Sequence, residues 1–310
     1  MKVRSLLSLV VVITGCGTGD QFVAIDEVPV SVESVVTTPD ASTGTFELDC
    51  GRNEERHLNA DNVVSSPGLR HGAHHTHEYV GNLSTDFAST DRSLAAGGTT
   101  CAGQDRSTYY WPVLRLTDRT GHDHHQQGGG VHGNSGEVLP PSSVAVSFTG
   151  SPVSEVLAMP RFLRMITGEP AALTNGGGRA RWSCTGFEDR RTDRYPRCAQ
   201  GSEVVRTFEF PSCWDGRNTD SASHRSHVVF PVAGGVCPPG TFPVPKLRVR
   251  VTHDVPEGRP FAIDSFPEQL RDPGTDHAMF ISVFPDELMA RVVDCLNAGR
   301  RCAEKKSAPR

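Results

Sequence analysis

Residues 245–255 read "PKLRVRVTHDV", and this stretch decides the class of fold. Leu247, Val249 and Val251 alternate with polar residues, which is the period-two pattern of a strand with one buried face. Runs of similar character occur at 142–150, 203–211 and 226–232, separated by segments rich in proline and glycine. We therefore predict a mainly β protein, an antiparallel β-sandwich of jelly-roll-like form with long loops.

One helix pattern follows these strands. Pro285 precedes the acidic pair Asp286 and Glu287, which favours the start of a helix. Apolar residues then recur at helical spacing through "DELMARVVDCLNAG" (286–299), and Gly299 is a typical stop signal. The sandwich is therefore expected to carry a C-terminal helix.

The charge balance restricts the partners of this chain. Its 310 residues include 31 Lys and Arg against 36 Asp and Glu, a net charge of −5, and both signs are mixed along the sequence. Nucleic-acid binding needs a basic stripe, so no nucleic-acid partner is expected. The length fits one disulfide-stapled β domain at 45–303, followed by a charged tail at 304–310.

The N-terminus indicates the compartment. A basic start and an apolar run at 6–13, too short to span a bilayer, predict a signal peptide at 1–15. The ending "ITGC" resembles a bacterial lipobox, in which Cys16 is lipidated; the alternative is an ordinary signal peptide with an incidental cysteine. Residues 16–44 are predicted to form a flexible tether. We expect an exported lipoprotein of the cell membrane or outer membrane, facing the periplasm or the exterior.

Cysteine usage agrees with export. The chain has nine cysteines, and eight remain once Cys16 is set aside. An even number in an exported chain favours disulfides, although eight cysteines allow 105 pairings. Pairing between sequence neighbours is the preferred arrangement. No CxxC motif occurs, which disfavours a zinc ribbon. The expected disulfide cysteines are Cys50 with Cys101, Cys184 with Cys198, Cys213 with Cys237, and Cys295 with Cys302.

Histidines cluster in "GLRHGAHHTHEYVGN" (68–82). His75 and His77 are spaced to share one face of a strand, where they can bind a metal ion, transfer protons or form a structural hydrogen-bonded cluster. Further metal ligands would come from His224, His227 or His277. A second group, His122, His124, His125 and His132, lies in a glycine-rich stretch, where an exposed loop with adventitious metal affinity is the favoured interpretation.

Aromatic and acidic residues supply the other candidates. Trp214 beside Cys213 can pack in the core or stack on a sugar ring. Asp215, Asn218 and Asp220 offer oxygen ligands for calcium, or simply build a turn. In "STYYWPVL" (107–114), Tyr109 and Trp111 share one strand face and Tyr110 takes the other. Arg164 can pair with a structural carboxylate or bind an acidic substrate.

Several segments together resemble one family. They are "SSPGLRHGAHHTHEYVGN" (65–82), "STYYWPVLRL" (107–116), "RFLRMITG" (161–168), "RWSC" (181–184), "FPSCWDGRNTDSASHRSHVVFP" (210–231), "CPPGTFPVPKLRVRV" (237–251) and "DHAMFISVFPDELM" (276–289). In this order they are similar to the secreted domain of unknown function DUF1996 of fungi and bacteria, often fused to carbohydrate-binding modules. The resemblance covers about residues 60 to 300 and implies no settled activity.

Three motifs of the family can be matched to individual residues of this chain. His75, His77, Tyr79, Gly81 and Asn82 match the first motif, whereas His71 and His74 are extras. The second motif is matched by Cys213, Trp214, Asp215, Gly216, Asn218, Asp220, His224, Ser226 and His227. The third usually places an aspartate two residues after its histidine, but here His277 is followed by Met279 and Phe280. A mechanism that needs a carboxylate at position 279 is therefore weakened.

Two classes of function remain. The first is an enzyme acting on polysaccharide, either a lyase in which a His–Tyr pair moves protons or a glycosidase using Asp215. The second is a non-catalytic surface module that binds an envelope or extracellular glycan, or a metal. The candidate cofactor is a divalent metal ion. Candidate catalytic residues are His75, His77, Asp215, His227 and His277; candidate substrate-binding residues are Tyr79, Asn82, Tyr109, Trp111, Arg164, Trp214 and His224.

The lipobox predicts a tethered mature protein that begins at Cys16. Mass analysis of the membrane fraction should find a diacylglyceryl adduct on this residue, because the modified cysteine becomes the new N-terminus. Cys16→Ser should release the protein from the membrane fraction. Continued membrane retention of that variant would rule the lipid anchor out.

Overall fold

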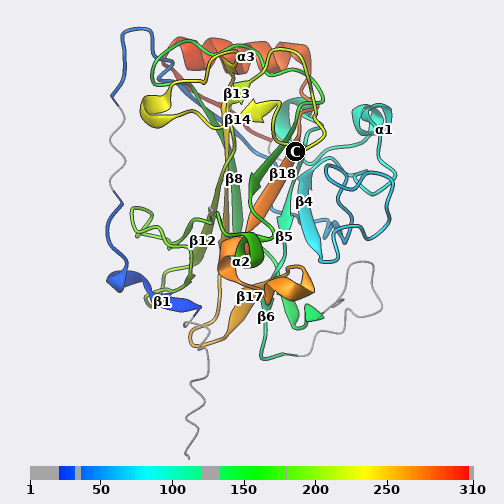
Figure 1. Cartoon of the computed structure of the whole chain (residues 1–310), viewed down its shortest axis with the longest axis vertical. Coiled ribbons are helices and arrows are strands. Elements are labelled where there is room, and N and C mark those ends of the chain that lie inside the picture. The colour runs from blue at the N-terminus through cyan, green and yellow to red at the C-terminus, as the bar shows by residue number, and fades with distance from the viewer. Residues whose placement is uncertain (1–20, 32–35, 120–132, 179, 307–310) are drawn as a thin grey trace, which may run out of the picture.

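The computed structural model describes residues 21–31, 36–119, 133–178 and 180–306. Two larger sheets dominate it (Figure 1). The six-stranded sheet has the order β10 (Trp182–Cys184), β12 (Val204–Glu209), β16 (Lys246–His253), β8 (Ser143–Thr149), β2 (Thr45–Leu48), β19 (Arg301–Glu304). The five-stranded sheet has the order β3 (Leu58–Asn59), β4 (His77–Gly81), β5 (Thr108–Pro112), β18 (His277–Ile281), β9 (Arg164–Gly168).

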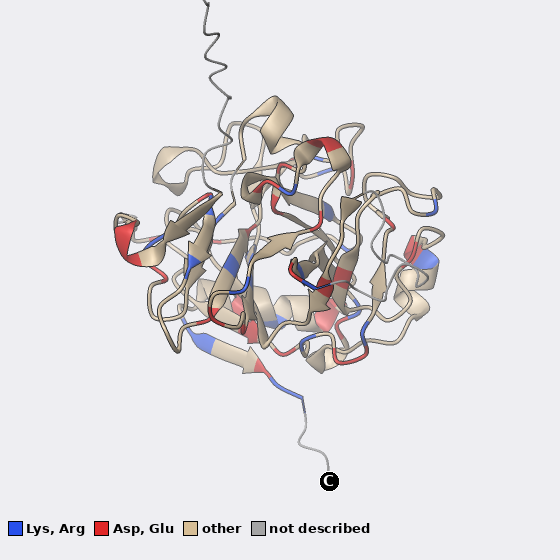
Figure 2. Cartoon of the chain, turned by 90° about the horizontal axis from the view of Figure 1, so that it is seen from below, with Lys and Arg blue, Asp and Glu red and all other residues tan. Residues whose placement is uncertain are grey.

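Smaller elements decorate these sheets. One three-stranded sheet contains β14 (Val228–Val229), β13 (Cys213–Trp214) and β15 (Phe242–Pro243), and another contains β17 (Phe261–Ile263), β6 (Leu114–Leu116) and β7 (Glu137–Leu139). The α-helices are α1 (Asp91–Ala96), α2 (Ala172–Asn175) and α3 (Asp286–Asn297). Charged residues of both signs are spread around the fold (Figure 2). No helix within the described ranges is long and apolar enough to cross a membrane.

The main core lies between the two larger sheets, so the predicted sandwich is confirmed. Phe148 and Val249 of the six-stranded sheet belong to the same buried cluster as Tyr109, Trp111 and Phe280 of the five-stranded sheet. Helix α3 contributes Leu288, Met289, Val292 and Leu296 to this cluster and crosses one end of the molecule (Figure 1). The expected C-terminal helix is therefore confirmed, and its apolar face is part of the core.

The outer face of the five-stranded sheet is also covered. Tyr79, Tyr110 and Met279 point away from the main core and form a second cluster with Val63 and Val64. The alternation predicted for "STYYWPVL" is confirmed, because Tyr109 and Trp111 lie in the first cluster and Tyr110 in the second. Both faces of this sheet are thus buried.

The N-terminal segment corrects the predicted tether. Within the described part of 16–44, β1 (Phe22–Ala24) pairs in parallel with β11 (Tyr195–Arg197), and Ile25 and Val28 are buried. Further along, Ser42 donates a main-chain hydrogen bond to the Ser151 carbonyl. The short β-branched runs of this segment show no clear periodicity, so the sequence did not predict a strand here. The segment packs on the domain because β11 offers a strand edge with which β1 pairs. Cys16 and the histidines at 122–132 lie outside the described residues.

Four disulfides join the predicted neighbours: Cys50–Cys101, Cys184–Cys198, Cys213–Cys237 and Cys295–Cys302. Their sequence separations of 51, 14, 24 and 7 residues make each a local staple. Disulfides persist mainly in oxidising compartments, so these four indicate an exported protein.

The buried carboxyl of Asp105 generates a pH prediction. It accepts hydrogen bonds from the Ser107 hydroxyl and the Tyr109 hydroxyl, yet burial raises its pKa from 3.8 to about 6. Between about pH 4 and pH 6, the folded chain therefore keeps a proton on Asp105 that the unfolded chain releases. The stability from this group should be complete below about pH 4 and lost as the pH rises through 6, a change of about 2–3 kcal/mol.

Urea unfolding between pH 4 and 7 should show this dependence in the wild type and a flatter profile in Asp105→Asn, which keeps the shape but cannot titrate. Identical pH profiles for the two proteins would contradict the prediction.

Candidate metal centre

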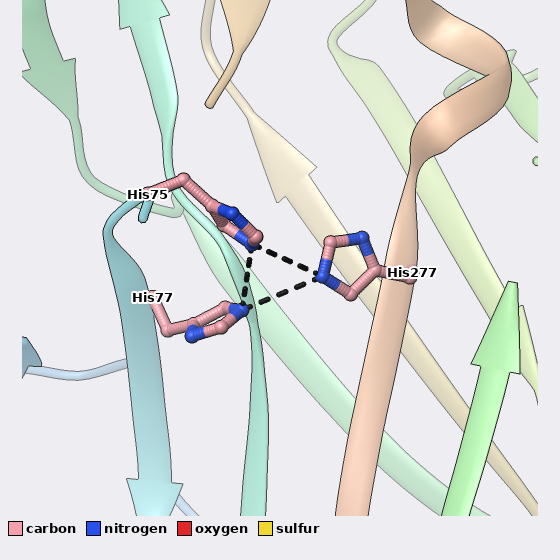
Figure 3. A group of neighbouring side chains, drawn as sticks. All are labelled: His75, His77 and His277. Carbon is pink, nitrogen blue, oxygen red and sulfur yellow. Dashed lines mark hydrogen bonds between the residues drawn. The ribbon is translucent and has the colours of Figure 1, made fainter. Parts of the chain in front are cut away.

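Three histidines from distant parts of the chain converge on one point (Figure 3). The Nε2 atoms of His75 and His77 are 3.1 Å apart, those of His75 and His277 are 3.2 Å apart, and those of His77 and His277 are 3.4 Å apart. All three side chains are at most 1% exposed. We refer to His75, His77 and His277 as the histidine triad.

Strand register brings two members of the histidine triad together. His77 is opposite Pro112 in the pairing of β4 with β5. On the other edge of β5, Met279 is opposite Tyr110, and continuing this antiparallel register by two residues places His277 opposite Pro112 as well. The two histidines therefore flank the same residue and lie on the outer face of the sheet, where their side chains reach across Pro112.

A turn, not a strand, supplies the third member. Strand β4 begins at His77, so the prediction that His75 and His77 share a strand face is corrected. His71 and His74 both have a φ of 57°, in the left-handed region, and the main chain of His74 donates to the His71 carbonyl. This tight turn folds His75 back toward His77. His71 contributes to this turn through its main chain, which accepts from His74 and donates to the Asp61 carboxylate at 2.7 Å.

Backbone carbonyls determine which ring nitrogens carry protons. Nδ1 of His77 lies 3.0 Å from the Asp61 carbonyl oxygen, and Nδ1 of His277 lies 2.8 Å from the Thr275 carbonyl oxygen. A carbonyl only accepts hydrogen bonds, so both Nδ1 atoms are donors. In the neutral rings both Nε2 atoms then present lone pairs to the centre of the histidine triad. Nδ1 of His75 has no hydrogen-bond partner among the described residues.

Burial keeps these rings neutral. Loss of solvation lowers the pKa of His75 well below its ordinary value, that of His77 to about 3 and that of His277 to about 4. Repulsion among the three rings adds to the effect at His75 and His77. A neutral imidazole has one N–H only. The 3.4 Å contact between His77 and His277 therefore sets two lone pairs against each other without a hydrogen.

A metal ion would resolve this conflict. Metal–nitrogen bonds of about 2.0–2.1 Å at tetrahedral angles place ligand nitrogens about 3.3 Å apart, which is the spacing of the histidine triad. Donation from the far ring nitrogen to a backbone carbonyl is also the usual support of a metal-binding histidine. Three imidazoles suit zinc, copper, iron or nickel, whereas calcium and magnesium prefer oxygen.

Two buried ion pairs fix the chain next to the histidine triad. Asp264 accepts two hydrogen bonds from the Arg115 guanidinium, at 2.7 and 3.1 Å, and one from the main chain of Thr76, the residue between His75 and His77. Asp276, which precedes His277, is held by both prongs of Arg206 at 2.6 and 2.9 Å. These residues and Asp61 carry no signal in the sequence, because no local pattern distinguishes a buried Arg–Asp pair from a surface one.

The other candidate catalytic residues have different partners. The carboxylate of Asp215 accepts from the main chain of Arg217 and Asn218 and from the Asn218 amide, all within 2.9 Å, which supports the turn interpretation. His227 lies between the Ser221 hydroxyl, at 3.0 Å, and the Arg164 carbonyl, at 2.7 Å. None of these hydrogen bonds includes a member of the histidine triad.

The candidate substrate-binding residues divide by exposure. Tyr79, Asn82, Tyr109 and Trp111 are at most 2% exposed and belong to the interior. Arg164 pairs with Asp91 at 2.7 Å, and His224 pairs with Asp220 at 2.8 Å. Trp214 is half-buried, and its indole N–H donates to the Asn218 carbonyl.

Comparison with known proteins gives one match. The family model described as "Domain of unknown function (DUF1996)" matches residues 61–270. No curated protein and no solved structure matches the chain. The matched range contains His75 and His77 and ends before His277, which joins them through the pairing of β18 with β5.

The buried pair of Arg206 and Asp276 generates a stability prediction. Asp276→Asn leaves the guanidinium buried without its carboxylate and should lower the free energy of unfolding by about 3–5 kcal/mol in urea titrations. Asp294→Asn is the matched control, because the Asp294 carboxylate is 72% exposed where it meets Arg300, and it should change stability little. Equal stability of the two variants would refute the structural role of this pair.

Proposed function

The chain belongs to the DUF1996 family, and from this premise we propose that it is an exported domain that binds one transition-metal ion through His75, His77 and His277. The observation that carries the proposal is the contact between lone pairs within the histidine triad. Zinc, copper, iron and nickel are the ions that an all-imidazole site accepts.

A purely structural role explains the histidine triad less well. Buried polar groups normally find hydrogen-bond partners, and an unsatisfied one costs about 1–3 kcal/mol. Three neutral rings hold three N–H groups in total, and two of these are directed outward to the Asp61 and Thr275 carbonyls. The third can satisfy His77 or His277, but it cannot separate the lone pairs of both. Bound metal satisfies all three nitrogens together.

Action on polysaccharide receives less support than metal binding. Tyr79, Tyr109 and Trp111 have no exposed ring face on which a sugar could stack, and the histidine triad is enclosed. Trp214 keeps partial exposure, beside the Asp215 turn. Glycan binding and a lipid anchor at Cys16 therefore remain predictions from the sequence, whereas the proposed metal site rests on the buried histidine triad.

Metal titration of the purified chain, after treatment with a chelator, tests the proposal. The four histidines at 122–132 are first replaced by alanine, so that adventitious binding there is removed. This background protein should bind one transition-metal ion. His77→Ala should weaken binding by more than about 100-fold, because even loss of an outer-shell partner typically costs 10–100-fold.

His71→Ala is the control, since His71 lies in the same segment but outside the histidine triad. It should retain the affinity of the background protein. Circular dichroism and thermal unfolding of the metal-free proteins show whether each variant is folded. Metal binding that survives His77→Ala and His277→Ala in folded proteins would overturn the proposal.

A further inference from the structure

We infer that the ion of the histidine triad is monovalent copper, held by three nitrogens without a fourth protein ligand. This inference rests on the proposed function and narrows it from a class of ions to one. Three independent features of the site lead to it: the number of donors, the enclosure of the site and the charge of its surroundings.

The number of donor atoms is three. Among the described His, Cys, Asp and Glu side chains, none adds a fourth ligand atom to the histidine triad. The Asp61 and Thr275 carbonyls are engaged by the Nδ1 atoms, on the side of each ring remote from the centre. The nearby Tyr110 hydroxyl donates to the Asn62 side-chain oxygen at 3.0 Å and accepts from the main chain of Val64.

The number of ligands that each ion requires separates the candidates, whereas the size of the nitrogen triangle does not. With edges of 3.1, 3.2 and 3.4 Å, the centre of the triangle lies about 1.9 Å from each nitrogen, slightly inside the 2.0–2.1 Å of a zinc–imidazole bond. Zinc would move out of the plane toward a fourth ligand, usually water, and copper(II) would require a tetragonal set. Copper(I), by contrast, would be satisfied by the three nitrogen ligands that His75, His77 and His277 offer.

The enclosure of the site opposes a fourth ligand from solvent. The Phe266 ring meets the His75 ring edge-on at a centroid distance of 5.0 Å, and the Tyr110 ring meets the His77 ring in the same manner at 5.1 Å. Each histidine is at most 1% exposed, so these rings and the surrounding chain shield the histidine triad from solvent. A divalent ion that must keep a water molecule is poorly matched to such a site.

The charge of the surroundings also favours a monovalent ion. Two buried carboxylates beside the site, Asp264 and Asp276, are each paired with an arginine, Arg115 and Arg206. The buried Asp61 carboxylate accepts hydrogen bonds from the main chain of His71 and Phe87. The three imidazoles contribute no negative charge. The cost of burying an ion grows with the square of its charge, so a monovalent ion costs about a quarter as much as a divalent one of similar size. No carboxylate or thiolate ligand offsets that difference in the described part of the site.

Parallel titrations of the full chain, in the background without the histidines at 122–132, test the inference. Copper(I) is added anaerobically in competition with bicinchoninate, and zinc is added in competition with a chromophoric zinc chelator. One copper(I) ion per chain should bind, and more tightly than zinc. His77→Ala should abolish this site, His71→Ala should preserve it, and X-ray absorption of the copper protein should show three nitrogen neighbours.

The outcomes separate the inference from the proposed function. Zinc binding that depends on His77, with weaker or no copper(I) binding, would overturn the inference and leave the proposed function standing. Four neighbours around copper would also overturn the inference alone. If neither ion bound to the folded protein in a manner that depends on His77, both the inference and the proposed function would be overturned.

Discussion

Strand β5 is paired on both edges, with β4 and with β18, and the alternation of its side chains organises the molecule. Tyr109 and Trp111 point into the sandwich, where they pack against the six-stranded sheet. Tyr110 and Pro112 lie on the opposite face. Because neighbouring strands follow the same alternation, His77 and His277 must lie on the outer face once Tyr109 and Phe280 are buried within. The core thus dictates the position of the histidine triad.

Charge burial gives the site its particular character. Arg115 with Asp264, and Arg206 with Asp276, are ion pairs in the interior. The Asp264 carboxylate accepts a hydrogen bond from the main chain of Thr76, and Asp276 directly precedes His277. A further buried acid, Glu78, accepts a hydrogen bond from the Trp111 indole at 2.7 Å. The donors and acceptors of these hydrogen bonds match, although Nη1 of Arg206 has no partner among the described residues. The histidine triad differs, since its inward-facing atoms are mainly acceptors, and this mismatch is the physical reason to expect a cation there.

Burial also separates the two classes of function that the sequence left open. The sequence allows Tyr109 and Trp111 to contact a substrate, but stacking on a sugar requires an exposed ring face. With Tyr109 and Trp111 in the core, their contribution is to stability, through packing such as that of Tyr109 with Phe280 at a ring centroid distance of 5.0 Å. The same burial strengthens the metal interpretation, because enclosure removes competing water from the three imidazoles.

Local patterns in the sequence determined much of this protein. Alternation in "PKLRVRVTHDV" predicted a strand, the apolar spacing after Pro285 predicted α3, and short separations between cysteines favoured the four disulfides. The sequence also singled out His75, His77 and His277, because unusual residue density and motif matches are local properties. It did not determine that β18 pairs with β5, or that Asp61 and Thr275 orient the imidazoles. The convergence of His277 with His75 joins residues 202 positions apart, and only the tertiary structure decides it, because strand partners and register depend on how the whole set of apolar faces is buried.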